Sequence, residues 1–448
     1  MLQLAWPLVL SFTLRATFTL VDRFYAGTLE GLEDASQAAI GLAQPIEFLM
    51  IACWVGASNG LTSKLSAAMG AKQSEKVDQL SRAGMLVSTA LAVAFLLFAA
   101  LLWFAPTIVA PSAAPDVVRQ FQIYASVVVG GSALTTFWSI LPDSVVKAHH
   151  DTVTTMWAGI LSSLLNVALN TLFVFVFEWG IFGIAFSTVI GRLAGLVYAW
   201  LRAAAHERRR RAEIGAGEPG RFDNALKEIL GIAIPSGLTY VLMAVEGAII
   251  NEILRRGDDP TVDLAAWSVY DGLGRSVLMP AIAFGVAMLP LISRRRAEGR
   301  GHELRRELRI AISVVVGYAL LLVAPFCLFA HHWLAEQFVK DPAALDRAAT
   351  GILWLPLVVV FAGSTLVARP AFDALDRAKL GLLVSVARSL VLAVPLTYLG
   401  GLVAAWLGYV RIEGYYAGSV VGTVVSCALV FGVVLRLGPF RRGGGRAS

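Results

Sequence analysis

Charged residues are scarce in this chain. Only 15% of its 448 residues are charged, whereas 57% are hydrophobic. Soluble domains carry about 25% charged residues, so a soluble protein of this composition could not keep its apolar surface out of water. The same composition excludes a disordered chain and a collagen-like chain.

Cysteine is scarce as well. The three cysteines, Cys53, Cys327 and Cys427, lie inside apolar runs and far from one another. This spacing excludes a secreted disulfide scaffold and a cysteine metal site, so we expect three small buried hydrophobic side chains. The sequence also lacks a Walker loop and a nucleophile elbow, which argues against ATP hydrolysis.

Long continuous apolar runs take up most of the chain. A transmembrane helix needs about 20 mostly apolar residues, whereas the strands of a transmembrane barrel alternate apolar and polar residues. The runs predict an all-α polytopic membrane protein with 12 transmembrane helices. They cover residues 2–25, 36–59, 83–107, 121–146, 153–177, 181–203, 228–253, 262–292, 308–332, 350–374, 380–403 and 413–437.

The basic residues predict how these spans are oriented. The loops after the even-numbered spans, together with the C-terminal tail, hold 25 of the 37 lysines and arginines, and the opposite loops hold seven. Because basic loops stay in the cytoplasm, we expect both termini to be cytoplasmic, in a bacterial-type inner membrane. The basic excess then attracts anionic membrane lipids, and no nucleic-acid partner is expected.

An internal repeat divides the chain at its midpoint. Its matched positions are Pro7 with Pro235 and Pro142 with Pro370 at a shift of 228, and Gly56 with Gly285 and Gly70 with Gly299 at a shift of 229. The repeat predicts an N-terminal lobe (1–205, spans 1–6), a polar cytoplasmic loop (206–226) and a C-terminal lobe (227–448, spans 7–12). Because each lobe has an even number of spans, a pseudo-two-fold axis along the membrane normal should relate the lobes.

Ionisable residues inside spans are costly and are therefore functional candidates. Asp22 in span 1 is the strongest of them. In span 5, Ser163, Asn166 and Asn170 share one helical face. Their polar groups could coordinate a cation or hold a water chain, or they could form hydrogen bonds between helices.

Further polar residues are candidates for a substrate cleft. Asp271 and Arg275 are spaced for an intrahelical ion pair. Arg192 lies within span 6, and Glu246 is the single acidic residue in the middle of span 7. The cleft candidates are Arg15, Gln44, Glu47, Glu246, Asp271 and Arg388.

Two other patterns suggest structural roles. Gly183, Gly191 and Gly195 in span 6 predict close helix packing. The run from His149 to Asp151 contains potential metal ligands but no further ligand follows, so we expect a solvated cytoplasmic loop and no metal site.

Several local motifs together carry a family resemblance. They are Pro7 followed by Asp22 and Gly27 in span 1, KLSAAMG at 64–70, NVALNTLF at 166–173 and GIFGIAFST at 180–188. With these motifs the chain resembles the multidrug and toxic compound extrusion (MATE) family, within the multidrug/oligosaccharidyl-lipid/polysaccharide exporter superfamily. The resemblance covers nearly the whole chain.

The resemblance implies an ion-coupling site in the N-terminal lobe. In that family the span-1 aspartate is the coupling carboxylate, and the matching positions here are Asp22, Asn166, Asn170 and Thr188. Relatives carry either aspartate or asparagine at the position of Asn170, so the coupling ion is H⁺ or Na⁺. Glu246 resembles an acidic residue of the family's C-terminal lobe, but residues 351–372 hold no carboxylate to pair with it.

The resulting expectation is a monomeric secondary antiporter without a cofactor. It would export small amphipathic, cationic compounds in exchange for H⁺ or Na⁺, with alternating access by rocking of the two lobes. Arg15, Arg192 and Arg388 support an alternative on the same fold, a flippase for lipid-linked saccharides or an exporter of anionic metabolites. An enzyme would need a clustered catalytic set, which the sequence lacks, and a channel fits the repeat less well.

Overall fold

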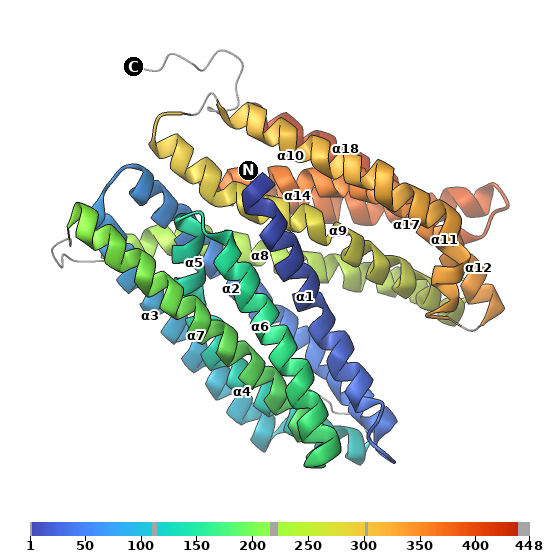
Figure 1. Ribbon diagram of the computed structural model, residues 1–448. Coiled ribbons are helices and arrows are strands. Elements are labelled where there is room, and N and C mark those ends of the chain that lie inside the picture. Colours follow the sequence, from blue (N-terminus) through green and yellow to red (C-terminus); the bar gives the residue numbers. More distant parts are fainter. Residues whose placement is uncertain (1, 110–113, 216–222, 301–302, 340, 438–448) are drawn as a thin grey trace. The chain divides into compact units, whose positions relative to one another are not determined.

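The computed structural model describes residues 2–109, 114–215, 223–300, 303–339 and 341–437, and these contain helices and no strand (Figure 1). The side chains of residues 12–20, which include the cleft candidate Arg15, lie outside the described ones. Eleven described helical segments are long and apolar enough to cross a membrane. Helix α1 (Leu2–Ala26), with 25 residues, is long enough to be the twelfth. The all-α polytopic fold is therefore confirmed.

The chain forms two compact units, which we describe separately. One unit is Trp6–Gly237, and the other is Leu238–Ser448 with Met1–Ala5. After α1, the first unit contains α2 (Glu33–Gly70), α3 (Ser74–Phe104), η1 (Pro106–Ile108), α4 (Pro115–Trp138), α5 (Ile140–Ala148), α6 (Thr152–Thr171), η2 (Leu172–Val176), α7 (Gly180–Ile214) and the first part of α8 (Asp223–Arg255).

The second unit contains the rest of α8 and ten further α-helices. They are α9 (Pro260–Ala297), α10 (Leu304–Tyr318), α11 (Ala324–Glu336), α12 (Pro342–Ile352), α13 (Leu355–Val358), α14 (Ser364–Ala368), α15 (Pro370–Ala374), α16 (Ala378–Val386), α17 (Val394–Trp406) and α18 (Arg411–Val434). Three π-helical segments interrupt its spans: η4 (Ala319–Val323), η5 (Val359–Gly363) and η6 (Ala387–Ala393).

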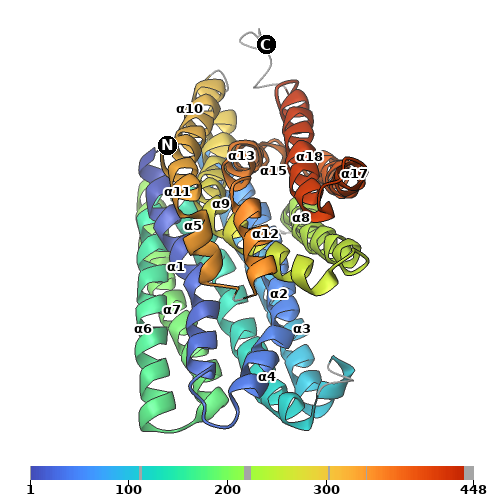
Figure 2. The same cartoon turned by 90° about the vertical axis from the view of Figure 1, so that its right-hand side faces the viewer.

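Glycines allow the closest helix contacts in both units. Helices α6 and α7 run side by side (Figure 1), and a Cβ on Gly191 would lie only 2.7 Å from the carbonyl oxygen of Ser162. In the second unit α17 packs along α18 (Figure 2), where a Cβ on Gly400 would lie 2.2 Å from the carbonyl oxygen of Gly414. Because hydrocarbon gives no hydrophobic drive for helix association, such close approach is a main source of packing energy.

Left-handed turns recur at the interval of the sequence repeat. Positive φ angles occur after α2 and after α9, after α5 and after α15, and before α7 and before α18. The matched residues are Lys72 and Gly299, His150 and Asp376, and Gly180 and Gly408, at intervals of 226 to 228 residues. Because non-glycine residues rarely adopt positive φ, these matches show that the two halves of the chain share turn geometry as well as sequence spacing.

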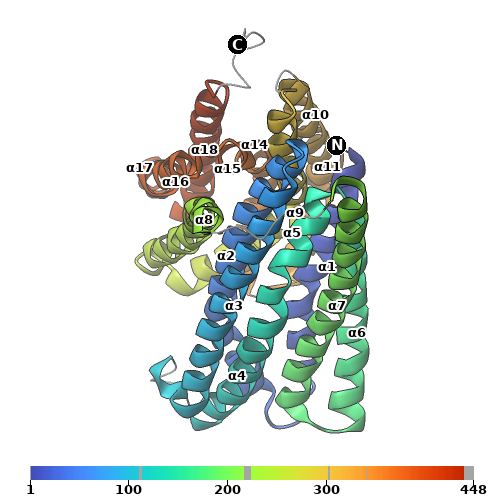
Figure 3. The same cartoon turned by 90° about the vertical axis from the view of Figure 1, so that its left-hand side faces the viewer.

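The boundary between the compact units falls inside a helix, after Gly237 of α8. Helix α2 runs beside α3 and α4 (Figure 3), and its glycines Gly56 and Gly60 lie against the backbone of the first part of α8. A Cβ on Gly56 would lie 2.5 Å from the carbonyl oxygen of Ala233. The amide of Asn59 donates to the hydroxyl of Ser236 at 2.9 Å, and Lys76 forms an ion pair with Glu228. These contacts fix the start of α8 to the first unit.

The α6–α7 contact generates a stability prediction. Gly191→Ala should destabilise the protein by about 1–3 kcal/mol, because the added methyl group must push α7 away from the α6 backbone. The measurement is the thermal unfolding temperature in detergent. Gly41→Ala on α2 is the matched control, since no described atom lies within 4 Å of its Cβ position, and alanine is the better helix former. Equal unfolding temperatures for the two variants would contradict the prediction.

Candidate functional site

Asp22 lies at the centre of a buried polar cluster in the Trp6–Gly237 unit. Its side chain is 2% exposed. The hydroxyl of Thr188 on α7 lies 3.2 Å from Oδ1 and 3.1 Å from Oδ2. Tyr124 on α4 donates to Oδ2 at 3.1 Å, and the amide of Asn170 on α6 donates to Oδ1 at 3.4 Å. Three helices thus supply donors to one carboxylate of α1.

The second layer of the cluster joins α6 to α7. The amide of Asn166 donates to the hydroxyl of Thr188 at 2.9 Å, and Ser187 donates to Oδ1 of Asn170 at 2.6 Å. The structure thus brings together Asp22, Asn166, Asn170 and Thr188, all of which the sequence singles out. Their polar groups lie near one another because α6 and α7 pack so closely.

Two buried oxygens beside this cluster have no hydrogen-bond partner among the described residues. They are Oδ1 of Asn166 and Oγ of Ser163, both on α6. A buried polar atom without a partner is costly and suggests an unseen water or ion. The cluster therefore has acceptor capacity to spare for a cation or a water molecule.

Helix α1 reaches this position through contacts with α6. The hydroxyl of Ser11 donates to the carbonyl oxygen of Thr155 at 3.4 Å, and a Cβ on Gly159 would lie 2.9 Å from that hydroxyl. Near the other end of α1, the hydroxyls of Tyr25 and Thr171 lie 2.6 Å apart. These contacts set the height of Asp22 opposite Asn170.

Two members of the cluster, Tyr124 and Ser187, were not predicted from the sequence. Tyr124 is 1% exposed and lies among apolar residues of α4. A single tyrosine in an apolar helix gives no spacing signal. Ser187 directly precedes Thr188, and its position inside the GIFGIAFST motif could have identified it.

The cleft candidates of the same unit include an ion pair. Nη2 of Arg192 on α7 lies 3.2 Å from Oε2 of Glu47 on α2, and Nη1 of Arg192 donates to Ser132 on α4. Both charged side chains are partly exposed. Gln44 is exposed one turn before Glu47 on α2.

In the Leu238–Ser448 unit, Glu246 has two partners that the sequence did not reveal. Its Oε2 accepts from the guanidinium of Arg388 at 3.1 Å and from the hydroxyl of Ser389 at 2.5 Å. The sequence gives no sign of these partners, because they lie on η6, far along the chain. The predicted intrahelical pair is confirmed, since Nη2 of Arg275 lies 2.7 Å from Oδ2 of Asp271.

The predicted solvated loop at 149–151 is instead part of a polar network. Asp151 caps α6 by accepting from the backbone N–H of Thr154 at 3.1 Å, and its Oδ2 lies 2.7 Å from Nε2 of His206 on α7. The rings of His149 and His206 stack with centroids 4.9 Å apart. The interpretation as a solvated loop was wrong because α7 continues to Ile214 and places His206 against this turn.

No set of three or more His, Cys, Asp or Glu side chains in the described part of the chain is arranged to hold a metal ion.

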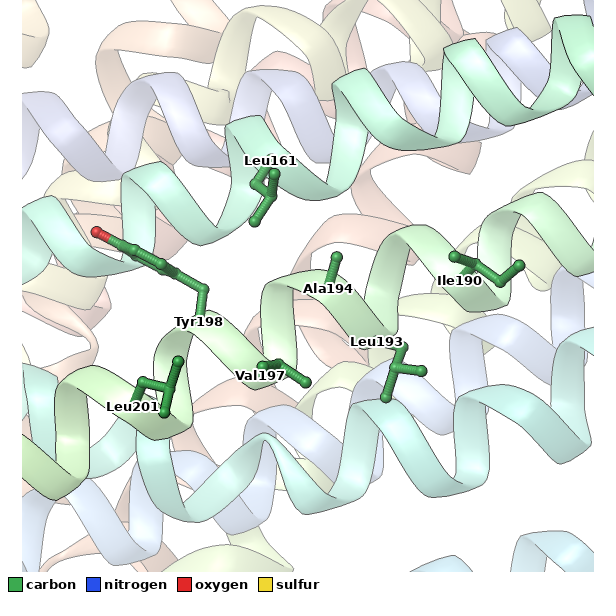
Figure 4. A pocket seen from close by; sticks show the side chains of 7 residues that line it. All are labelled: Leu161, Ile190, Leu193, Ala194, Val197, Tyr198 and Leu201. Carbon is green, nitrogen blue, oxygen red and sulfur yellow. The ribbon is translucent and has the colours of Figure 1, made fainter.

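A shallow groove on the surface of α7 is a poor candidate site. Figure 4 shows its lining, in which Leu161 of α6 stands opposite residues of α7 such as Ala194. The hydroxyl of Tyr198 is its one polar side-chain group, and Leu193 and Val197 are exposed. Exposed apolar side chains on a membrane span suit contact with lipid tails, so the groove does not suggest a polar ligand.

The cap at Asp151 gives a pH-dependence prediction. Partial burial acts to raise the pKa of Asp151, but hydrogen bonds from Thr154 and His206 outweigh it and lower that pKa below its ordinary value. A lowered pKa stabilises the fold above the unfolded-state pKa of about 3.9 and loses this effect as pH falls further. Asp151→Asn should therefore lower the unfolding temperature at neutral pH, with the difference from wild type closing below about pH 4. A difference that stays constant down to that pH would show that the carboxylate charge is not responsible.

Comparison with known proteins covers almost the whole chain. The MatE family model matches residues 7–172 and again residues 235–399, and the two matches begin 228 residues apart, the shift of the sequence repeat. The FAD transporter of Shewanella oneidensis is 22% identical, over 89% of this chain and 87% of the relative. Probable multidrug resistance protein YoeA of Bacillus subtilis is 22% identical, over 76% of this chain and 73% of the relative.

Solved structures show the same fold. The outward-facing conformation of a multidrug resistance MATE family transporter superimposes with a TM-score of 0.85 at 19% identity, over 97% of this chain and 94% of that one. The family matches extend over more than half of the chain. The chain therefore belongs to the MatE family, and the protein is a membrane transporter of the MATE type rather than an enzyme.

Proposed function

We propose that this transporter is a secondary antiporter in which Asp22 couples the inward flow of H⁺ or Na⁺ to the export of small amphipathic compounds. The observation that carries the proposal is the buried carboxylate of Asp22 with its three neutral donors. Among the described side chains, which leave out Arg15, no lysine or arginine forms an ion pair with Asp22. An unpaired buried carboxylate is costly, and taking up a cation removes this cost.

The same cluster offers ligands for either ion. A proton needs only the carboxylate of Asp22, whose hydrogen bonds to Thr188 and Tyr124 can be rearranged. Na⁺ needs several oxygens, and the spare Oδ1 of Asn166 and Oγ of Ser163 are available nearby. In both cases neutralising Asp22 changes how strongly α1 is held to α6 and α7. Ion and substrate then favour different states, which is the requirement for alternating access.

The substrate class in this proposal rests on the relatives. Several carry names that describe multidrug resistance, which supports export of small amphipathic, cationic compounds. We further propose that the protein works as a monomer without a cofactor, in a bacterial-type inner membrane with both termini in the cytoplasm. Membrane lipids surround it, and nucleic acid has no role.

A second candidate is the export of an anionic metabolite or the flipping of a lipid-linked saccharide. The partly exposed Arg192 and Arg388 favour it, since a guanidinium group binds carboxylates and phosphates well. The relative named FAD transporter adds support. Liposome assays separate the two candidates: flipping of a lipid-linked phosphate without transport of organic cations would favour the second.

The coupling role of Asp22 is testable in everted membrane vesicles. Asp22→Asn should reduce gradient-driven uptake of ethidium at least about tenfold, because the amide cannot take up a proton and binds Na⁺ poorly. The fold should survive, since asparagine keeps the shape and can still accept from Thr188 and Tyr124. Uptake is followed by fluorescence, and folding by gel filtration of the purified variant.

Asp116→Asn is the matched control, because Asp116 is exposed at the start of α4. It should transport ethidium like the wild type. Wild-type rates for Asp22→Asn in a well-folded preparation would rule out the coupling role.

The ion itself can be identified in proteoliposomes that carry a pH gradient or a sodium gradient alone. Asn166→Leu removes the spare amide oxygen but leaves Asp22 in place. If Na⁺ is the coupling ion, this variant should lose sodium-driven transport. If H⁺ is the coupling ion, proton-driven transport should persist at a reduced rate.

A further inference from the structure

Two acid–arginine pairs lie inside the spans of the Leu238–Ser448 unit. One joins Glu246 on α8 to Arg388 on η6, with Ser389 donating to the same carboxylate oxygen. The other joins Asp271 to Arg275 on α9. The coupling cluster around Asp22 lies in the other unit and does not include them.

The two pairs are neighbours. Nη2 of Arg275 lies 3.9 Å from the position that a Cβ would take on Gly247, the residue that follows Glu246. The missing side chain at Gly247 thus leaves room for the guanidinium of Arg275 beside α8. The two pairs therefore lie beside adjacent residues of α8, Glu246 and Gly247.

The exposure of these side chains indicates access from water. The side chains of Asp271 and Arg275 are 46% and 59% exposed, although α9 crosses the membrane. Charged side chains do not face hydrocarbon, so this part of α9 must face a water-filled space. Glu246 and Arg388 are half-buried beside it.

Each pair keeps donors and acceptors free. The partners of Arg388 among the described residues are both bound through Nη2, which leaves its Nε–H and Nη1–H groups. Glu246 uses Oε2 for both of its contacts and keeps Oε1, and Asp271 likewise uses Oδ2 and keeps Oδ1. A pair of this kind can accept from a cationic group and donate to an anionic group at once, without being broken.

The backbone at Arg388 is also unusual. The seven residues of η6 form a π-helix, and π-helical segments occur frequently at functional sites because they redirect side chains. Both Arg388 and Ser389 of this segment contact Oε2 of Glu246.

We propose that Glu246, Arg388, Asp271 and Arg275 form a head-group subsite for a zwitterionic amphiphile, a substrate that carries an ammonium and a carboxylate or phosphate close together. The inference rests on the proposed transport function and specifies the charge of its substrate. A ligand with one charge would leave that charge uncompensated, since each carboxylate of the subsite already has its arginine. A zwitterion satisfies both free oxygens and free N–H groups and adds no net charge.

Three indole compounds test the proposal. L-tryptophan, tryptamine and indole-3-propionate share the ring and a two-carbon tether and differ in head group: zwitterion, cation and anion. Binding of each radiolabelled compound to purified full-length protein in nanodiscs is measured near neutral pH. Tryptophan should bind about tenfold more tightly than either of the others, the effect of one further charge-assisted hydrogen bond.

Substituting the arginine and substituting the glutamate of the subsite should each remove a different part of the preference for tryptophan. Arg388→Gln should lower the affinity for tryptophan to that for tryptamine, because the carboxylate loses its donor. Glu246→Gln should lower it to that for indole-3-propionate, because the ammonium loses its acceptor. The double variant Glu246→Gln/Arg388→Gln leaves no unpaired charge and should fold even where a single variant does not. In that double variant the preference for tryptophan should shrink, because only the Asp271–Arg275 pair remains.

Arg294→Gln is the matched control. It removes an exposed i,i+4 partner of Glu298 on the same helix as Arg275 but near the helix end, and it should keep the wild-type order. Equal affinities for the three compounds in the wild type, including no measurable binding of any, would overturn the proposal. So would an undiminished preference for tryptophan in the double variant.

The transport test and the binding test can reject the coupling role of Asp22 and the subsite independently of each other. If Asp22→Asn transports normally but tryptophan is still preferred, the coupling role fails and the subsite stands. If gradient-driven transport depends on Asp22 but the three compounds bind equally, the subsite alone is wrong.

Discussion

The cost of a charge in hydrocarbon governs where polar groups lie in this protein. Mid-span charged side chains are paired across helices or along them, as Glu47 with Arg192, Glu246 with Arg388 and Asp271 with Arg275. The pattern recurs at i,i+4 spacing on α5 and beside α15, with Lys147 on Asp143 and Arg369 on Asp373. Each of these pairs forms within one compact unit, so each unit compensates its own charges.

Asp22 differs from these carboxylates because its recorded partners are neutral. Hydroxyl and amide groups can stabilise a carboxylate, and they can also turn to accommodate a proton or a cation. A guanidinium partner would hold the charge in place and remove the need for another cation. The two units therefore share turn geometry and both contain acid–arginine pairs, and the Trp6–Gly237 unit holds in addition a carboxylate whose recorded donors are neutral.

The sequence was most informative where the signal was periodic or local. Apolar runs predicted the spans, and the family resemblance predicted that Asn166, Asn170 and Thr188 lie beside Asp22. The Asp271–Arg275 pair followed from an i,i+4 spacing. Contacts between residues far apart in the chain produce no periodic or local pattern in the sequence. Arg388 lies 142 residues from Glu246, and His206 lies 55 residues from Asp151. Tyr124 was missed because one tyrosine in an apolar helix looks like any other core aromatic residue.

The position of the seam between the compact units has a mechanical consequence. Helix α7 ends at Ile214 and α8 begins at Asp223, and the boundary between the units falls within α8, whose first part contacts Gly56 and Asn59 of α2 and Lys76 of α3. A continuous helix transmits bending and torque, as a flexible loop cannot. Near this boundary α8 contains Pro235 and Gly237, a proline and a residue without a side chain, and helices bend most easily at such positions. A bend there would change the direction in which the chain enters the Leu238–Ser448 unit.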